Sequence, residues 1–189
     1  ILIRSSNIGS LMIGRKVGEE KLKNFLEKLG LLKNLNFELE EIGRPLNFNW
    51  EKCKLETVSF GHGITTTPLQ AAAAYASLTN GGLSVNPTLS LQKKLNVTNQ
   101  HYIVSKKTSD QINKILRKVV SDKEGTGSFA DIFGYDVGGK TGTAKSYTNG
   151  NKNINTFISI FPTEQPKYVL LIILDDPKGA PHITYNYRG

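Results

Sequence analysis

A chain of 189 residues is long enough to form one domain with a hydrophobic core and too short for two domains to be expected. Apolar residues make up 38% of it and charged residues 21%, and the longest apolar run, residues 168–174, has the length of a buried strand, not of a membrane-spanning helix. The net charge is +8, but the lysines interleave with glutamates and accompany no recognition motif, so we do not expect nucleic-acid binding.

Disulfide and metal chemistry are not expected either. The single cysteine, Cys53, has no partner for an internal disulfide. The three histidines, His62, His101 and His182, lie far apart in sequence and do not have the spacing of metal ligands. We therefore predict no metal site, and the sequence shows no ligand pattern for an organic cofactor.

Two amphipathic helices are expected at the start of the chain. The first covers residues 5–13, with Ser5 or Ser6 as its N-cap. The second covers residues 19–29 and is followed by Gly30, where a glycine typically ends a helix. Their apolar faces consist of Ile8, Leu11 and Met12 in the first helix, and Leu22, Phe25, Leu26 and Leu29 in the second.

Two further helices follow an irregular stretch, residues 31–55, which we interpret as a surface loop. Thr67, Pro68 and Gln70 have the pattern of an N-cap, a first-turn proline and a capping box, so a helix should begin there. It continues through an alanine run, ends near Asn80-Gly81-Gly82 and should pack tightly. The next helix is predicted over residues 107–120, and its inner face should carry Ile112, Ile115, Leu116 and Val119.

The last third of the chain has the pattern of β-strands. Residues 136–144, 155–161 and 167–174 are separated by polar or proline-containing turns, and such short connections favour antiparallel hairpins. Helices come first and strands last. We therefore predict an α+β fold in which helices pack on a mostly antiparallel sheet.

Two short motifs carry residues suited to acyl transfer. Residues 5–7 form Ser-x-Asn at a helix start, and residues 140–143 form Lys-Thr-Gly-Thr on a predicted strand. A nucleophilic hydroxyl needs a base, and a departing amine needs a proton that a second hydroxyl can relay. A substrate carboxylate needs cationic and hydroxyl partners, and a glycine on the strand lets a substrate backbone approach closely. Each motif alone also fits an ordinary helix cap or a surface lysine.

The stretches around these motifs resemble the class B penicillin-binding proteins over nearly the whole chain. The resemblance rests on Phe60-Gly61-His62-Gly63, Thr67-Pro68-Leu69-Gln70, Ala74-Tyr75-Ala76, Asn80-Gly81-Gly82, Gly125-Thr126-Gly127, Gly134-Tyr135 and residues 138–144. Residues 174–179 are similar to the septal, division-specific branch. The resemblance implies the penicillin-binding protein transpeptidase (serine β-lactamase-like) fold.

The resemblance also implies roles for individual residues. Ser5 would relay a proton, and Asn7 would hydrogen-bond the substrate amide and help hold a catalytic lysine. Lys140 would supply positive charge. The hydroxyls of Thr141 and Thr143 would bind the substrate carboxylate, and the Thr143 N–H would form half of an oxyanion hole. Gly142 would leave the strand edge open to the substrate.

The chain departs from the family pattern at both ends. Only four residues precede Ser5, so the expected upstream Ser-x-x-Lys is not in the sequence, and the family's terminal helix is not either. Ser90 and Lys93 have the right spacing, but they follow Ser-x-Asn, which reverses the family order, and one match is expected by chance. We therefore interpret residues 1–189 as a partial transpeptidase domain, incomplete at both ends. Alone it should be inactive, expose apolar sheet surface and fold poorly.

The implied function is that of a peptidoglycan D,D-transpeptidase, which cross-links stem peptides during division and binds penicillin. The alternatives are a non-catalytic binding module, either a β-lactam sensor or a divisome scaffold, and a β-lactamase. The family further implies stem peptides and β-lactams as ligands, with a lipid-linked glycan polymerase and division proteins as partners. It also implies a parent anchored in the cytoplasmic membrane by its N-terminus, with this domain on the extracytoplasmic side.

Overall fold

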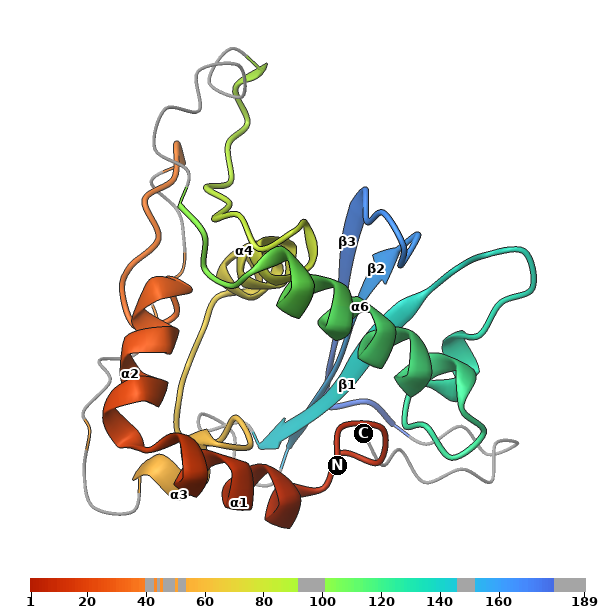
Figure 1. Ribbon diagram of the computed structural model, residues 1–189, viewed down its shortest axis with the longest axis horizontal. Helices are drawn as coiled ribbons and strands as arrows, with labels where there is room; N and C mark the ends of the chain where they lie inside the picture. The colour runs from red at the N-terminus through yellow and green to blue at the C-terminus, as the bar shows by residue number, and fades with distance from the viewer. Residues whose placement is uncertain are drawn as a thin grey trace. The chain divides into compact units, whose positions relative to one another are not determined.

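The computed structural model describes residues 1–39, 43, 45, 50, 54–91, 101–145 and 152–178 (Figure 1). Cys53, Lys93, His182 and the C-terminal residues 179–189, on which some predictions fall, lie outside the described residues. The chain divides into two compact units. The first comprises Ile1 and residues 6–113, and the second comprises residues 2–5 and 114–189.

The first unit begins with α1 (Asn7–Val17) and α2 (Glu19–Lys28). Both helices are predicted correctly, and Ser6 is the N-cap of α1, because its hydroxyl accepts a hydrogen bond from the Gly9 N–H at 3.2 Å. Ile8 and Met12 share one face of α1, as the sequence indicates, but this apolar face is not buried. Ile8 is 75% exposed and Met12 is 59% exposed, whereas the buried residues of α1 are glycines. The helix therefore uses its smallest side chains for close packing.

Two more helices belong wholly to the first unit. The short helix α3 (Lys54–Val58) is not predicted from the sequence, and α1 contacts it. The helix α4 (Pro68–Thr79) has the predicted capping box, in which Thr67 and Gln70 exchange hydrogen bonds. The Gln70 side chain is buried and donates to the carbonyl of Gly30 at 3.0 Å, which connects the start of α4 to the end of α2.

The long helix α6 (Lys106–Ser121) contributes to both units. Its first half carries buried polar residues that bind the end of α4: Asn113 donates to the Thr79 carbonyl at 3.1 Å, and Ser109 accepts from the Gly81 N–H at 3.0 Å. None of the helices in the described part of the chain is both long and apolar enough to cross a membrane.

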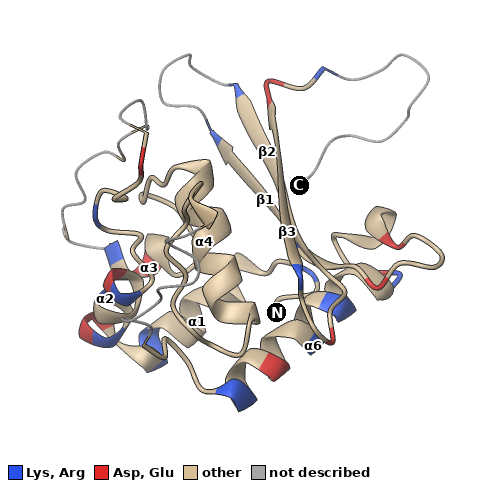
Figure 2. Ribbon diagram, turned by 90° about the horizontal axis from the view of Figure 1, so that it is seen from above, with Lys and Arg blue, Asp and Glu red and all other residues tan. Residues whose placement is uncertain are grey.

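The second unit is built on a three-stranded antiparallel sheet in the order β1 (Gly138–Lys145), β2 (Asn153–Phe161) and β3 (Tyr168–Asp175). Its strands are the three that the sequence predicts, and β2 carries no charged residue (Figure 2). The second half of α6 and the short helix η1 (Ser128–Ala130) also belong to this unit. The predicted α+β fold with a mostly antiparallel sheet is confirmed.

The core of the second unit lies between α6 and the sheet. Leu116, Val119 and Val120 of α6 are buried, as are Ile158 and Ile160 of β2. The prediction that Ile115 lies on the inner face of α6 is wrong, because its side chain is 37% exposed. The buried stripe of this half of the helix instead follows the i, i+3, i+4 spacing that starts from Leu116.

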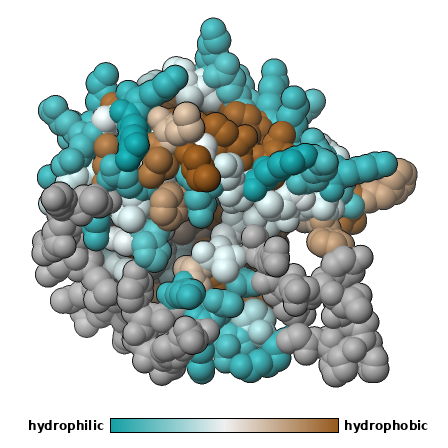
Figure 3. All heavy atoms as spheres, turned by 90° about the horizontal axis from the view of Figure 1, so that it is seen from below, coloured by the Kyte–Doolittle hydropathy of each residue, from teal (hydrophilic) through white to brown (hydrophobic). Residues whose placement is uncertain are grey.

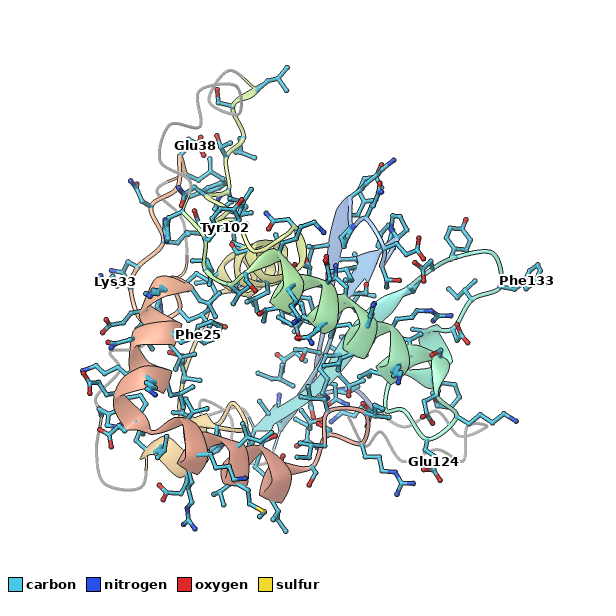
Figure 4. All side chains as sticks on the ribbon, in the orientation of Figure 1. Phe25, Lys33, Glu38, Tyr102, Glu124 and Phe133 are labelled. Carbon is cyan, nitrogen blue, oxygen red and sulfur yellow. The ribbon has the colours of Figure 1, made fainter. Side chains whose placement is uncertain are left out.

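Several large apolar side chains of the described residues remain at the surface, and Figure 3 shows apolar side chains gathered on one face. Leu170, Ile172 and Leu174 alternate along β3, and each is 47% exposed. In the connection between α6 and β1, Phe133 is fully exposed and projects from the loop (Figure 4). The described part of the chain therefore exposes apolar sheet surface, as predicted.

Candidate active site

Ser5 lies in a tight turn that leads into α1. Its N–H donates to the Leu2 carbonyl at 3.2 Å, and its φ of 52° places it in the left-handed region that non-glycine residues seldom adopt. Because Ser6 caps α1, the Ser5 hydroxyl is not used for capping. Such a conformation costs about 1–3 kcal/mol and is common at functional sites.

Lys140 brings the two predicted motifs together. Its ammonium group donates to the Ser5 hydroxyl at 2.8 Å, across 135 positions of sequence. It also donates to the Thr141 carbonyl at 2.9 Å and lies 3.5 Å from the Thr141 hydroxyl. Burial disfavours the charged form and lowers the pKa of Lys140 below its ordinary value. The pair therefore places a half-buried cation beside a hydroxyl that can pass on a proton.

The position of Lys140 depends on contacts at the start of β1. Arg117 of α6 donates to the Val137 carbonyl at 3.0 Å and lies within 3.2 Å of the Asp136 carboxylate. That carboxylate also accepts hydrogen bonds from the N–H and the hydroxyl of Thr163. Burial by itself would raise the pKa of Asp136, but the bonds from Thr163 and the Arg117 charge outweigh it and lower the pKa. The ionised carboxylate thus ties β1 to α6.

The rest of the Lys-Thr-Gly-Thr motif lies along β1. The Thr141 hydroxyl donates to the Thr126 hydroxyl at 2.8 Å, and Thr143 is exposed. β1 pairs with β2 on one side and is an edge strand of the described sheet, so its other edge is available for pairing with an extended ligand.

Packing requires a small residue at position 142, for a reason that the sequence does not reveal. A β-carbon at this position would lie 2.6 Å from the hydroxyl oxygen of Thr156, its partner on β2. A larger residue would therefore push against the neighbouring strand, in addition to any effect on an incoming substrate.

Ser5, Lys140 and Thr141 lie together in the second unit. Asn7 is the exposed first residue of α1 and belongs to the first unit. The sequence did not single out Thr126, although the Gly-Thr-Gly pattern around it was a visible signal. Among the described residues, no group of histidine, cysteine and carboxylate side chains could hold a metal ion.

Comparisons with known proteins show which proteins this chain resembles. The family model described as "Penicillin binding protein transpeptidase domain" matches residues 1–188. The chain is 37% identical to the "Probable peptidoglycan D,D-transpeptidase FtsI" of Caulobacter vibrioides, covering 93% of this chain and 32% of that protein. It is 32% identical to "Stage V sporulation protein D" of Bacillus subtilis, covering 95% of this chain and 30% of that protein.

A solved structure has the same fold. The crystal structure of penicillin-binding protein 3 from Mycobacterium tuberculosis, complexed with aztreonam, matches with a TM-score of 0.79 and 27% identity, over 93% of this chain and 44% of that one. The chain spans about a third of the length of the curated relatives reported above.

Proposed function

The chain belongs to the penicillin-binding protein transpeptidase domain family, and we propose on this basis that the whole protein is a peptidoglycan D,D-transpeptidase. The observation that carries the proposal is the 2.8 Å hydrogen bond from the Lys140 ammonium to the Ser5 hydroxyl. It joins the two motifs whose residue types suit acyl transfer. It also lies beside a strand edge on which an extended peptide can pair.

The reaction we propose proceeds through an acyl-enzyme. A serine of an upstream Ser-x-x-Lys motif, preceding Ile1 in the whole protein, adds its oxygen to the penultimate D-Ala carbonyl of one stem peptide. The C–N bond then breaks, and terminal D-Ala leaves after its nitrogen gains a proton. An amine of a neighbouring stem peptide next attacks the acyl-enzyme, loses a proton and restores the serine.

Within this scheme Ser5 relays the proton between the nucleophile and the leaving or entering amine. Lys140 orients the Ser5 hydroxyl and supplies charge that stabilises neighbouring anionic groups. Thr141 and Thr143 bind the substrate carboxylate through their hydroxyls, and the Thr143 N–H is one donor of the oxyanion hole. Asn7 binds the substrate amide carbonyl and helps to hold the upstream lysine.

We propose that β-lactams acylate the same upstream serine, because they present a strained amide and a carboxylate to the same groups. The fold similarity to a penicillin-binding protein complexed with aztreonam supports this assignment. We place the domain outside the cytoplasm, in a protein anchored to the membrane by its N-terminus. Its partners would be a lipid-linked glycan polymerase and division proteins, and the resemblance of residues 174–179 to the septal branch supports the division role.

Labelling of the whole protein with a fluorescent penicillin tests the proposal. We expect a covalent adduct that survives denaturation, and D-Ala release from a stem peptide ending in D-Ala-D-Ala when an acceptor amine is present. Ser5→Ala should slow acylation by about 100-fold, the lower range for loss of an acid–base group. The control is Ser10→Ala, because the Ser10 hydroxyl binds the Ser6 carbonyl within α1.

The outcomes separate the candidate functions. A whole protein with neither adduct nor D-Ala release would refute the transpeptidase proposal and favour a scaffold. An adduct without D-Ala release would favour a sensor, and rapid hydrolysis of the adduct would favour a β-lactamase.

A further inference from the structure

Thr126 connects two parts of the candidate active site. It lies in the connection between α6 and β1, and its N–H donates to the Ile3 carbonyl at 3.1 Å, in the turn that carries Ser5. Its hydroxyl accepts a hydrogen bond from the Thr141 hydroxyl at 2.8 Å. One residue therefore contacts the Ser5 turn through its backbone and β1 through its side chain.

We propose that Thr126 is a positioning residue that orients the Thr141 hydroxyl toward the carboxylate of the incoming substrate. The inference rests on the proposed function, in which Thr141 binds that carboxylate. In this role Thr126 does not itself touch the substrate and acts through Thr141.

The connection that carries Thr126 is held in a tight conformation. The Gly125 N–H donates to the Asp122 carbonyl at 2.8 Å, and the Gly127 N–H donates to the carbonyl of the fully buried Val119 at 3.2 Å. A β-carbon at Gly125 would lie 2.1 Å from that Val119 carbonyl oxygen, so only glycine fits there. The position of Thr126 is thus set by the end of α6.

A second contact joins the same connection to the turn that carries Ser5. Glu124, which lies just before Thr126 in the connection (Figure 4), pairs with Arg4. Both side chains are mostly exposed, so the pair adds little stability by itself. The backbone bond from Thr126 to Ile3 is the main link, and it does not depend on the side chain at position 126.

The direction of the hydroxyl protons explains why a hydroxyl is needed at position 126. A threonine hydroxyl donates one hydrogen bond, and the Thr141 hydroxyl donates its bond to Thr126. To bind a carboxylate, the Thr141 proton must turn toward the ligand. Thr126 can then reverse and donate its own proton to the Thr141 oxygen. Hydrogen bonds then run in series from Thr126 to Thr141 to the carboxylate, and each bond in the series strengthens the next.

Paired substitutions in the whole protein test this role. Thr126→Val keeps the shape and the backbone bond to Ile3 but removes the hydroxyl, and Thr126→Ser retains the hydroxyl. The substrates are an N-acyl-D-alanyl thioester with a free terminal carboxylate and its counterpart in which that carboxylate is replaced by a methyl group. Ser128→Ala is the control for a general disturbance of the connection.

We expect Thr126→Val to lower the acylation rate constant for the carboxylate substrate by about fivefold, the effect of one neutral hydrogen bond. The methyl counterpart should change by less than about twofold on the same reasoning. Thr126→Ser should restore most of the rate. In a Thr141→Val background, the Thr126→Val change should have almost no further effect, because Thr126 acts through Thr141.

Equal slowing of both substrates, or an effect that persists in the Thr141→Val background, would overturn the positioning role. So would a rate for Thr126→Val equal to that of the wild type. In these cases wild-type acylation would still support the proposed function. A wild-type protein that no penicillin or thioester acylates would overturn both together.

Discussion

Replacement of Lys140 by methionine is the sharpest test of the proposed catalytic contact. The change keeps a long unbranched side chain and removes the ammonium, which donates to Ser5 at 2.8 Å and to the Thr141 carbonyl at 2.9 Å. Only the Ser5 contact lies on the proposed proton path. A hydrogen bond that involves a charged group contributes about 1.5–3 kcal/mol, so its loss should slow acylation by about 10- to 150-fold.

The assay is the second-order rate constant for acylation of the whole protein by a fluorescent penicillin, with thermal unfolding measured on each variant. Lys145→Met is the matched control, because Lys145 lies on the same strand, is exposed and is not part of the site. Lys140→Arg should give an intermediate rate, since it keeps the charge but has a planar group in place of a compact one. A Lys140→Met protein that folds like the wild type and acylates within about twofold of it would refute the reasoning.

Two further predictions follow from the charged groups. A free lysine has a pKa of about 10.4. Burial lowers the pKa of Lys140 below this value, so Lys140 should lose its positive charge at a lower pH than a free lysine does. Acylation should therefore decline at alkaline pH, and Lys140→Arg should move that decline upward; an unmoved profile would contradict the assignment. Asp136→Asn should destabilise the whole protein by about 1–3 kcal/mol at neutral pH, because it disrupts the bonds from Thr163. The folded pKa of Asp136 is lowered, so the difference should shrink as the pH falls below about 4. Asp131→Asn, which alters a single contact to Arg117, is the control and should cost less.

Local patterns predicted most of the elements because they report on short-range physics. The capping box of Thr67 and Gln70 involves residues three positions apart, so the start of α4 is visible in the sequence. The alternation in β2 and its short connections indicated antiparallel pairing in the same way. The helix α3 was not predicted, because its five residues show no periodicity long enough to recognise.

Predictions of which side chains are buried were less accurate. Ile8 and Met12 are apolar and share a face of α1, yet both are exposed, and Ile115 of α6 is exposed as well. A helical pattern shows which residues lie on one face, but the neighbouring elements decide which face is covered.

The sequence by itself determined the family and the residue types of the site, because the stretches that carry the resemblance, such as residues 67–70 and 138–144, are each contiguous in the chain. Only the tertiary structure decided that Lys140 reaches Ser5, that Thr126 binds Thr141, and that Gly142 lies against Thr156. These contacts join residues between 14 and 135 positions apart. They depend on how the Ser5 turn, the end of α6 and the strands β1 and β2 pack against one another. A local sequence pattern reports only on neighbouring residues, so it does not predict this packing.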